Sequence, residues 1–238
     1  MLTGEPSFRR LPSVAKTPTK MQSFDSVLSA IPAKQMNAGL EYLERLVRDP
    51  SNPEVALTYL RSLDGDLHAE MVQTLKDEPE GRRLLEERPR LDAASLKLDE
   101  LGRLPTGTLG QAFARFFRER GLKPFATREP IKDDADYLTN RLRETHDLWH
   151  LVTGYGTHPS GEIELQAFSY GNMKNPSSLL ILSYVPGVNL RRGVDGLPAW
   201  LAGAFRRGQA ARSFASIVWE DHWEKPLAAL RNELRVAR

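Results

Sequence analysis

The sequence contains no cysteine among its 238 residues, and this absence removes several kinds of site at once. Disulfide bonds, zinc sites built from thiolates and cysteine nucleophiles all require a thiol side chain. Any metal ion that this protein binds must therefore be held by nitrogen and oxygen atoms.

The sequence also lacks a large excess of charge of either sign and a long apolar run. Its 33 basic residues are interleaved with 31 acidic ones, which gives a formal net charge of +2. This near balance argues against a dedicated nucleic-acid-binding protein. The longest apolar stretches, such as 177–188 (SSLLILSYVPGV), are far shorter than the roughly 20 residues needed to cross a bilayer. We therefore expect a soluble or peripheral protein that binds no nucleic acid.

The first residues lack the apolar centre of a secretory signal. The segment 1–22 carries four basic residues against one acidic residue, with serine, threonine and proline scattered through it. A mitochondrial transit peptide shares this basic bias, but prolines at positions 6, 12 and 18 disfavour an amphipathic helix. We predict a flexible tail over residues 1–23, with a transit peptide as the alternative.

From position 24 onward, apolar residues recur three and four positions apart, which predicts helices. The pattern is clear in four segments: 39–47 (GLEYLERLV), 53–63 (PEVALTYLRSL), 66–78 (DLHAEMVQTLKDE) and 80–89 (EGRRLLEERP). Prolines 50, 53, 79 and 89 lie at the ends of these segments. Asn52 is a suitable N-cap for the second of these helices, because a proline follows at the first helical position.

The middle of the chain continues the helical pattern. The segment 92–124 predicts a short helix, a tight turn at 105–107 and an amphipathic helix that Gly121 closes. The apolar and aromatic face of that helix is expected to lie in the core, although such a face could also line a cavity for a lipid. The segment 133–154 predicts one long helix that ends at Gly154.

Two later segments complete the predicted fold. The run 177–185 (SSLLILSYV) has the length of a strand, but no partner strand is evident, so we predict a helix. The segment 197–236 predicts two or three helices, with arginines 206, 207 and 212 on a solvated face that could also meet phosphate or an anionic membrane surface. A chain of this length holds one full core, and we predict a single-domain, all-α helical bundle over residues 24–238.

Potential metal ligands are concentrated in the run 143–152 (RETHDLWHLV), which contains His146, Asp147 and His150. In a helix, with about 100° of rotation per residue, the two histidines lie one turn apart on one face and the aspartate flanks them. One helix face could therefore hold a cation. The alternative is a capping or hydrogen-bonded pair of histidines in the core.

Glu162 extends this cluster. The loop before it, 152–161 (VTGYGTHPSG), contains three glycines and one proline, so it can reverse the chain and bring the next helix back against the first. Glu164 is a rival for the same role, but two residues further along a helix its side chain points to roughly the opposite side. We therefore prefer Glu162.

The chemistry of these side chains suits a divalent ion without fixing its identity. Imidazole nitrogens favour zinc and other first-row metals, whereas carboxylates also serve magnesium and manganese. Two carboxylates neutralise a divalent ion. Any coordination position left open could take water or a substrate oxygen, as in catalytic metal sites.

The pattern HDxxH, followed after eleven residues by a glutamate, resembles the signature of the coenzyme Q (ubiquinone) biosynthesis protein 4 family. Five surrounding blocks resemble family blocks in the same order: 77–91 (DEPEGRRLLEERPRL), 98–113 (LDELGRLPTGTLGQAF), 141–154 (RLRETHDLWHLVTG), 161–168 (GEIELQAF) and 223–236 (WEKPLAALRNELRV). The resemblance covers residues 40–236 and leaves the N-terminal tail outside.

This resemblance implies an all-helical fold and a metal bound by His146, Asp147, His150 and Glu162. Zinc is the metal usually given for the family, and magnesium would also suit the ligands. The resemblance further implies a role in ubiquinone biosynthesis, acting on polyprenylated benzoate rings. We predict a metal-dependent carbon–carbon lyase that promotes decarboxylation and hydroxylation at ring position C1, with the same four residues as its catalytic residues. An apolar tunnel or cavity beside the metal would receive the isoprenoid tail.

Two other functions remain open. In the first, the protein is a non-catalytic, isoprenoid-lipid-binding scaffold that organises a quinone-biosynthesis complex. In the second it is a metallohydrolase, but HDxxH has an aspartate where zinc peptidases carry the glutamate of HExxH, and the further residues of an HD-type phosphohydrolase are missing.

The expected partners and location follow from the implied substrate. The partners are a polyprenylated aromatic or isoprenoid lipid, other quinone-biosynthesis proteins and a second copy of the chain in a homodimer. We expect a bacterial cytoplasmic protein with peripheral membrane contact. The alternative is the mitochondrial matrix face of the inner membrane.

Overall fold

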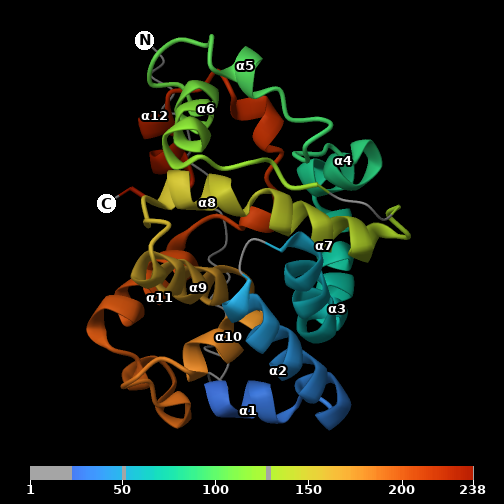
Figure 1. The fold of residues 1–238 in the computed structure, drawn as a ribbon, viewed down its shortest axis with the longest axis vertical. Helices are drawn as coiled ribbons and strands as arrows, with labels where there is room; N and C mark the ends of the chain where they lie inside the picture. The colour runs from blue at the N-terminus through green and yellow to red at the C-terminus, as the bar shows by residue number, and fades with distance from the viewer. Residues whose placement is uncertain (1–22, 50–51, 127–129, 238) are drawn as a thin grey trace, which may run out of the picture.

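The computed structural model describes residues 23–49, 52–126 and 130–237, and these residues form a helical domain (Figure 1). The α-helices are α1 (Phe24–Ser29), α2 (Ala33–Arg48), α3 (Pro53–Asp77), α4 (Pro79–Glu87), α5 (Leu98–Leu101), α6 (Leu109–Arg120), α7 (Asp134–Glu144), α8 (His146–Thr153), α9 (Pro159–Met173), α10 (Pro176–Ser183), α11 (Ala199–Ala210) and α12 (Leu227–Glu233). Three short 3₁₀ helices are η1 (Leu190–Gly196), η2 (Phe214–Ser216) and η3 (Trp219–His222). The described ranges contain no β-strand, so the predicted all-α fold is confirmed.

The predicted tail over residues 1–23 lies outside the described residues, apart from Ser23. That serine is the N-cap of α1, and its side chain accepts a hydrogen bond from the amide of Ser26. Within the described ranges, none of the helices combines the length and the apolar character needed to cross a membrane.

Several helix boundaries follow the local signals in the sequence. The side chain of Asn52 accepts hydrogen bonds from the amides of Glu54 and Val55 and so caps α3, as predicted. Gly121 closes α6 with a left-handed conformation, at φ 62°, which glycine adopts without a steric cost. The run predicted as a helix at 177–185 is largely α10, which starts at a proline.

One expected break is missing. The segments 53–63 and 66–78 were predicted as separate helices, but they form the single helix α3. Gly65 lies between them, and a glycine in a helix interior costs only about 1 kcal/mol relative to alanine, so it does not by itself end a helix. With no proline in this stretch, α3 continues and packs against both α2 and α7.

One helix is interrupted where the sequence predicted no break. The segment 133–154 forms two helices, α7 and α8, which meet at Thr145. The hydroxyl of this threonine donates to the carbonyl oxygens of Arg141 and Leu142, at 2.9 and 3.3 Å. Such bonds from a side chain back to the preceding turn bend helices. His146 and Asp147 therefore lie in the first turn of α8 and His150 in its last turn, and not at the C-terminal end of one long helix.

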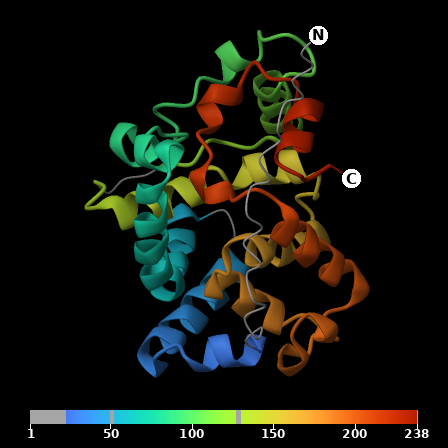
Figure 2. The same cartoon turned by 180° about the vertical axis from the view of Figure 1, so that it is seen from behind.

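Helices α9 and α11 pack tightly side by side (Figures 1 and 2). A Cβ atom at Gly171 would lie 2.2 Å from the carbonyl oxygen of Phe205, and a Cβ atom at Gly208 would lie 2.0 Å from that of Phe168. These two glycines let the helix backbones approach more closely than any side chain would allow. The close packing fixes α9, whose first turn carries Glu162.

The C-terminal end of α8 is held by two arginines from later in the chain. Arg231 donates to the carbonyl oxygens of Leu151 and Val152, at 2.8 and 3.0 Å. Arg207 donates to the carbonyl oxygen of Thr153 at 3.0 Å, and its guanidinium lies over the ring of Tyr155. The prediction that Arg207 belongs to a solvated basic face was therefore wrong, because the helix-end carbonyl groups need a donor and this arginine supplies it.

Candidate metal centre

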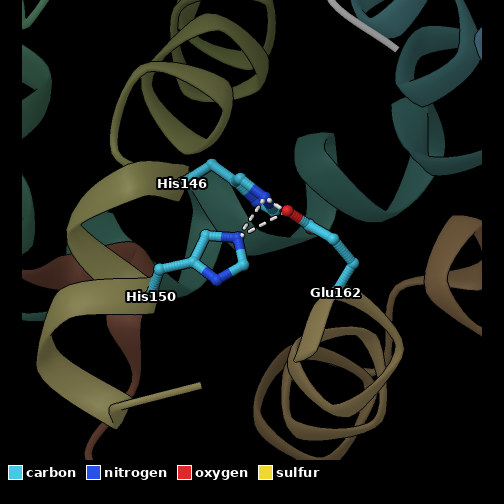
Figure 3. Close-up of side chains that lie close together, drawn as sticks. All are labelled: His146, His150 and Glu162. Atoms are coloured by element: carbon cyan, nitrogen blue, oxygen red, sulfur yellow. Dashed lines mark hydrogen bonds and ion pairs between the residues drawn. The ribbon is translucent and has the colours of Figure 1, made fainter. Parts of the chain in front are cut away.

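His146 and His150 lie one turn apart on α8 and face Glu162 in the first turn of α9 (Figure 3). The Nε2 atoms of the two histidines are 3.2 Å apart. The carboxylate oxygens of Glu162 lie 3.4 Å from Nε2 of His146 and 3.1 Å from Nε2 of His150. One potential ligand atom of each residue thus lies within 4.8 Å of the others.

These distances fit a single metal ion. Nitrogen and oxygen ligands lie about 2.0–2.1 Å from a tetrahedral zinc ion, so neighbouring ligand atoms lie about 3.3–3.4 Å from one another. The three measured separations, 3.1 to 3.4 Å, are close to that value. Two histidines and one glutamate are also a set that catalytic zinc sites use, with the fourth position left to water or substrate.

The loop between α8 and α9 brings the glutamate to the histidines. Gly154 ends α8 with φ at 76°, and the Nδ1 atom of His158 accepts a hydrogen bond from the amide of Gly161 at 3.2 Å, which caps α9. A Cβ atom at Gly161 would lie only 2.1 Å from the carbonyl oxygen of Gly156. The predicted chain reversal is present, and His158 is a helix cap that the sequence pattern did not reveal.

The second nitrogen of His150 orients its ring. Its Nδ1 atom lies 3.3 Å from the carbonyl oxygen of Tyr155. A carbonyl group can only accept, so Nδ1 carries the proton and Nε2 keeps its lone pair for a ligand. The side chain of His150 is 1% exposed, against 23% for His146 and 40% for Glu162. The centre is therefore open to solvent on the side of His146 and Glu162.

The charge of Glu162 suits a metal ligand. Burial by itself would raise the pKa of its carboxyl group, but hydrogen bonds with His146 and His150 outweigh burial and hold this pKa well below its ordinary value. This lowered pKa keeps the glutamate ionised at neutral pH.

The structure does not bring Asp147 into this group. The aspartate follows His146 in the first turn of α8, and its carboxylate is not among the ligand atoms that lie together. Adjacent helix residues point about 100° apart, which explains why it only flanks the histidines. Glu164 is also outside the group, as expected from its position two residues beyond Glu162.

Two further side chains next to the centre were not singled out from the sequence. Trp149 has its ring centroid 6.0 Å from that of His146, and its buried Nε1 donates to no partner among the described residues. Arg143, in the last turn of α7, interacts electrostatically with Asp147 and Glu162. The apolar tunnel beside the metal stays a prediction.

Comparison with known proteins finds a matching family. Residues 56–238 match the family described as Coenzyme Q (ubiquinone) biosynthesis protein Coq4. The chain is 37% identical over 169 residues to the mitochondrial ubiquinone biosynthesis protein coq4 of Aspergillus fumigatus (strain CBS 144.89), across 68% of this chain and 58% of that protein. It is 34% identical over 172 residues to the mitochondrial COQ4 homolog of Rattus norvegicus, across 68% of this chain and 63% of that protein.

A more distant relative extends the match, and a solved structure supports the fold. The mitochondrial COQ4 protein of Coprinopsis cinerea is 26% identical over 206 residues, across 84% of this chain and 70% of that protein. A crystal structure of a candidate ubiquinone biosynthesis protein from Nostoc punctiforme superposes with a TM-score of 0.64 at 29% identity, across 85% of this chain and 98% of that one. The chain thus spans between 58% and 70% of the length of the three relatives named.

Proposed function

Because the chain belongs to the coenzyme Q (ubiquinone) biosynthesis protein Coq4 family, we propose that it binds a polyprenylated benzoate or quinone ring at the centre formed by His146, His150 and Glu162. The observation that carries the proposal is the convergence of the two Nε2 atoms, 3.2 Å apart, on the carboxylate of Glu162, whose Oε2 lies 3.4 Å from His146 and whose Oε1 lies 3.1 Å from His150. That spacing suits one divalent ion.

The metal proposed is zinc, with magnesium as the alternative. A bound divalent ion supplies a Lewis acid that polarises an oxygen of the ring substituents. The protein's own residues would hold it. The carbonyl oxygen of Tyr155 accepts a hydrogen bond from Nδ1 of His150, which leaves Nε2 of that ring for the ion, and the histidines lower the pKa of Glu162. We propose Asp147 as a fourth protein ligand, because its carboxylate would balance the second charge of the ion. It lies outside the group of ligand atoms in this structure, and a substrate oxygen would then take a fifth coordination position.

The reaction proposed is the replacement of the ring carboxyl group at C1 by a hydroxyl group. The bond between the ring and the carboxyl carbon breaks, the carboxyl group leaves as carbon dioxide, and a bond forms between C1 and oxygen. The ring loses two electrons in this exchange. The proposal includes dioxygen as the co-substrate that supplies the oxygen atom, together with a two-electron reductant, because the second oxygen atom of dioxygen takes up two further electrons and two protons and leaves as water. The isoprenoid tail adds affinity, at about 0.8 kcal/mol for each buried methylene group.

A second candidate function is a non-catalytic scaffold that presents an isoprenoid intermediate to partner enzymes. Two exposed aromatic side chains favour a surface for partners or membrane: Tyr184 is 65% exposed and Trp200 is 43% exposed. They lie before and after the arginine-containing segment η1. Aromatic and basic side chains together are typical of membrane interfaces. Other quinone-biosynthesis proteins and a second copy of the chain are proposed as partners of either function.

The location proposed is the mitochondrial matrix face of the inner membrane. The names of the fungal and rat relatives include the word mitochondrial, and they give no support to the first expectation, the bacterial cytoplasm. The metallohydrolase alternative has no counterpart in those names.

One experiment separates catalysis from scaffolding. Purified protein loaded with zinc is incubated under ¹⁸O-labelled dioxygen with a prenylated 4-hydroxybenzoate and a small-molecule two-electron reductant, and with no other protein. The expected result is a product, identified by mass spectrometry, that has lost carbon dioxide and gained one labelled oxygen atom. Binding of the ligand without conversion would favour the scaffold, and absence of both zinc binding and ligand binding would contradict the proposal.

A further inference from the structure

Arg143 is a cationic side chain beside the metal centre that forms no hydrogen bond or ion pair with the described residues. It lies in the last turn of α7, four residues before Asp147 and seven before His150. Residues at this spacing lie on one side of a helical path. Its guanidinium lies 4.9 Å from the centroid of the Phe125 ring, and among the described residues it makes no hydrogen bond or ion pair.

The other arginines of this region that point inward are all paired. Arg141 donates to both carboxylate oxygens of Glu220, at 2.8 and 2.6 Å. Arg90 binds the carboxylate of Glu144. A cation that is shielded from water without a partner is costly. Arg143 therefore departs from the pattern that the protein follows nearby.

The nearby carboxylates offset the positive charge of Arg143 without contacting its guanidinium. Burial lowers the pKa of its guanidinium, whereas the charges of Asp147 and Glu162 raise it. Neither carboxylate comes within ion-pair distance of it, while Glu162 is already engaged by the two histidines. The guanidinium donors therefore form no hydrogen bond with either carboxylate, although both charges act on the group.

The charges at the centre indicate which kind of ligand group would balance them. A divalent ion brings two positive charges, and Glu162 and Asp147 bring two negative ones. Arg143 then remains as one positive charge beside the ion, partly shielded from solvent. An anionic group on the ligand would balance this charge and would occupy the free guanidinium donors, which match a carboxylate in a two-pronged hydrogen bond.

We propose that Arg143 binds the carboxylate of the aromatic acid, so that the metal site is left to another oxygen of the ring. This inference rests on the proposed function and adds the recognition of an anionic substrate to it. It also accounts for product release. When the carboxyl group leaves as carbon dioxide, the product no longer carries the charge that Arg143 recognises, so it binds more weakly than the substrate.

The test compares two ligands and three variants. The ligands are a prenylated 4-hydroxybenzoate and the matching prenylated phenol, which lacks the carboxylate. Their dissociation constants are measured by calorimetry for zinc-loaded wild type, Arg143→Gln and Arg143→Lys, with Arg115→Gln as a control. Arg115 is an exposed arginine whose partner, Glu119, is on the same helix. Zinc affinity and thermal stability are measured for every protein.

The wild type is expected to bind the acid more tightly than the phenol. Arg143→Gln should weaken binding of the acid by tenfold to about a hundredfold, the usual range for a hydrogen bond to a charged group. It should leave the affinities for the phenol and for zinc within about twofold. Arg143→Lys, which keeps the charge, should restore part of the loss and serves as the informative variant if the glutamine variant does not fold. Arg115→Gln should match the wild type.

Two results would overturn the inference, and a third would contradict the proposed function on which it rests. Equal wild-type affinities for acid and phenol would show that the carboxylate is not recognised. Equal losses for acid and phenol in Arg143→Gln would show that the arginine only supports the fold of the site. Both results leave the proposed function standing if zinc and the ligands bind. A wild type that binds neither ligand would contradict the proposed function itself.

Discussion

The Nε2 atom of His150 faces the Nε2 atom of His146 at 3.2 Å, while the Nδ1 atom of His150 points to a backbone carbonyl. Two imidazole nitrogens that both present lone pairs repel each other at this distance. A proton shared between them, or a cation bound by both, removes the repulsion. The arrangement is therefore prepared to accept a positive charge between the rings.

Removal of one histidine should abolish tight metal binding. We expect His150→Ala to weaken zinc binding about a hundredfold or more, because one of the three converging ligands is lost. Competition with a chromophoric chelator measures the affinity. His222→Ala is the control, since that histidine lies in η3, outside the ligand group. Unchanged zinc affinity in His150→Ala would rule out the centre as the zinc site.

The two nearby glutamates should respond differently to neutralisation. Glu162→Gln keeps the size of the side chain but removes the charge, and we expect zinc affinity to fall about tenfold or more. Glu164→Gln should have no effect, because Glu164 lies outside the ligand group. The same chelator titration compares the two variants. A larger loss of zinc affinity in Glu164→Gln than in Glu162→Gln would show that Glu164 is the ligand.

The packing of α9 on α11 should be sensitive to a single methyl group. Gly171→Ala places a Cβ atom 2.2 Å from the carbonyl oxygen of Phe205, and we expect it to lower the free energy of unfolding by about 1–3 kcal/mol. Gly203→Ala is the matched control on α11, because nothing lies within 4 Å of the added atom. Alanine favours helix over glycine, so the control should be neutral or slightly stabilising. Urea denaturation provides both values, and equal effects would refute the steric argument.

His68 should make the fold sensitive to mild acid. Burial lowers the pKa of this histidine from 6.5 to about 4, and its Nδ1 lies 2.7 Å from the hydroxyl oxygen of Thr139. The unfolded chain therefore binds a proton between these two pH values that the folded chain does not, so stability falls as the pH is lowered through this window. Relative to His68→Gln, the wild type should lose on the order of 3 kcal/mol between pH 6.5 and 4. Above pH 7 the difference between the two proteins should stay constant; a difference that is constant down to pH 4 would show that His68 is not buried in its neutral form.

The parts of the fold that depend on neighbouring residues could be predicted from the sequence. Asn52 caps the helix that follows it and Gly121 closes the helix that precedes it, because both roles need only a few adjacent residues. The grouping of His146, His150 and Glu162 also followed from helix periodicity and a loop rich in glycine.

The parts that depend on distant residues could not be predicted. The break at Thr145 and the anchoring of α8 by Arg231 involve contacts that helix periodicity does not encode. Arg143 had no distinguishing pattern, since only the packed structure shows that its guanidinium lies over the ring of Phe125 and forms no hydrogen bond or ion pair with the described residues.

The bonds from Arg231 to the end of α8 also bear on the order of events during synthesis. Arg231 lies 80 residues after Leu151, whose carbonyl oxygen it binds. A chain that grows on the ribosome therefore exposes both histidines long before the arginine that anchors their helix is made. The metal site can take its final form only after that late segment has emerged from the exit tunnel and has folded back onto α8.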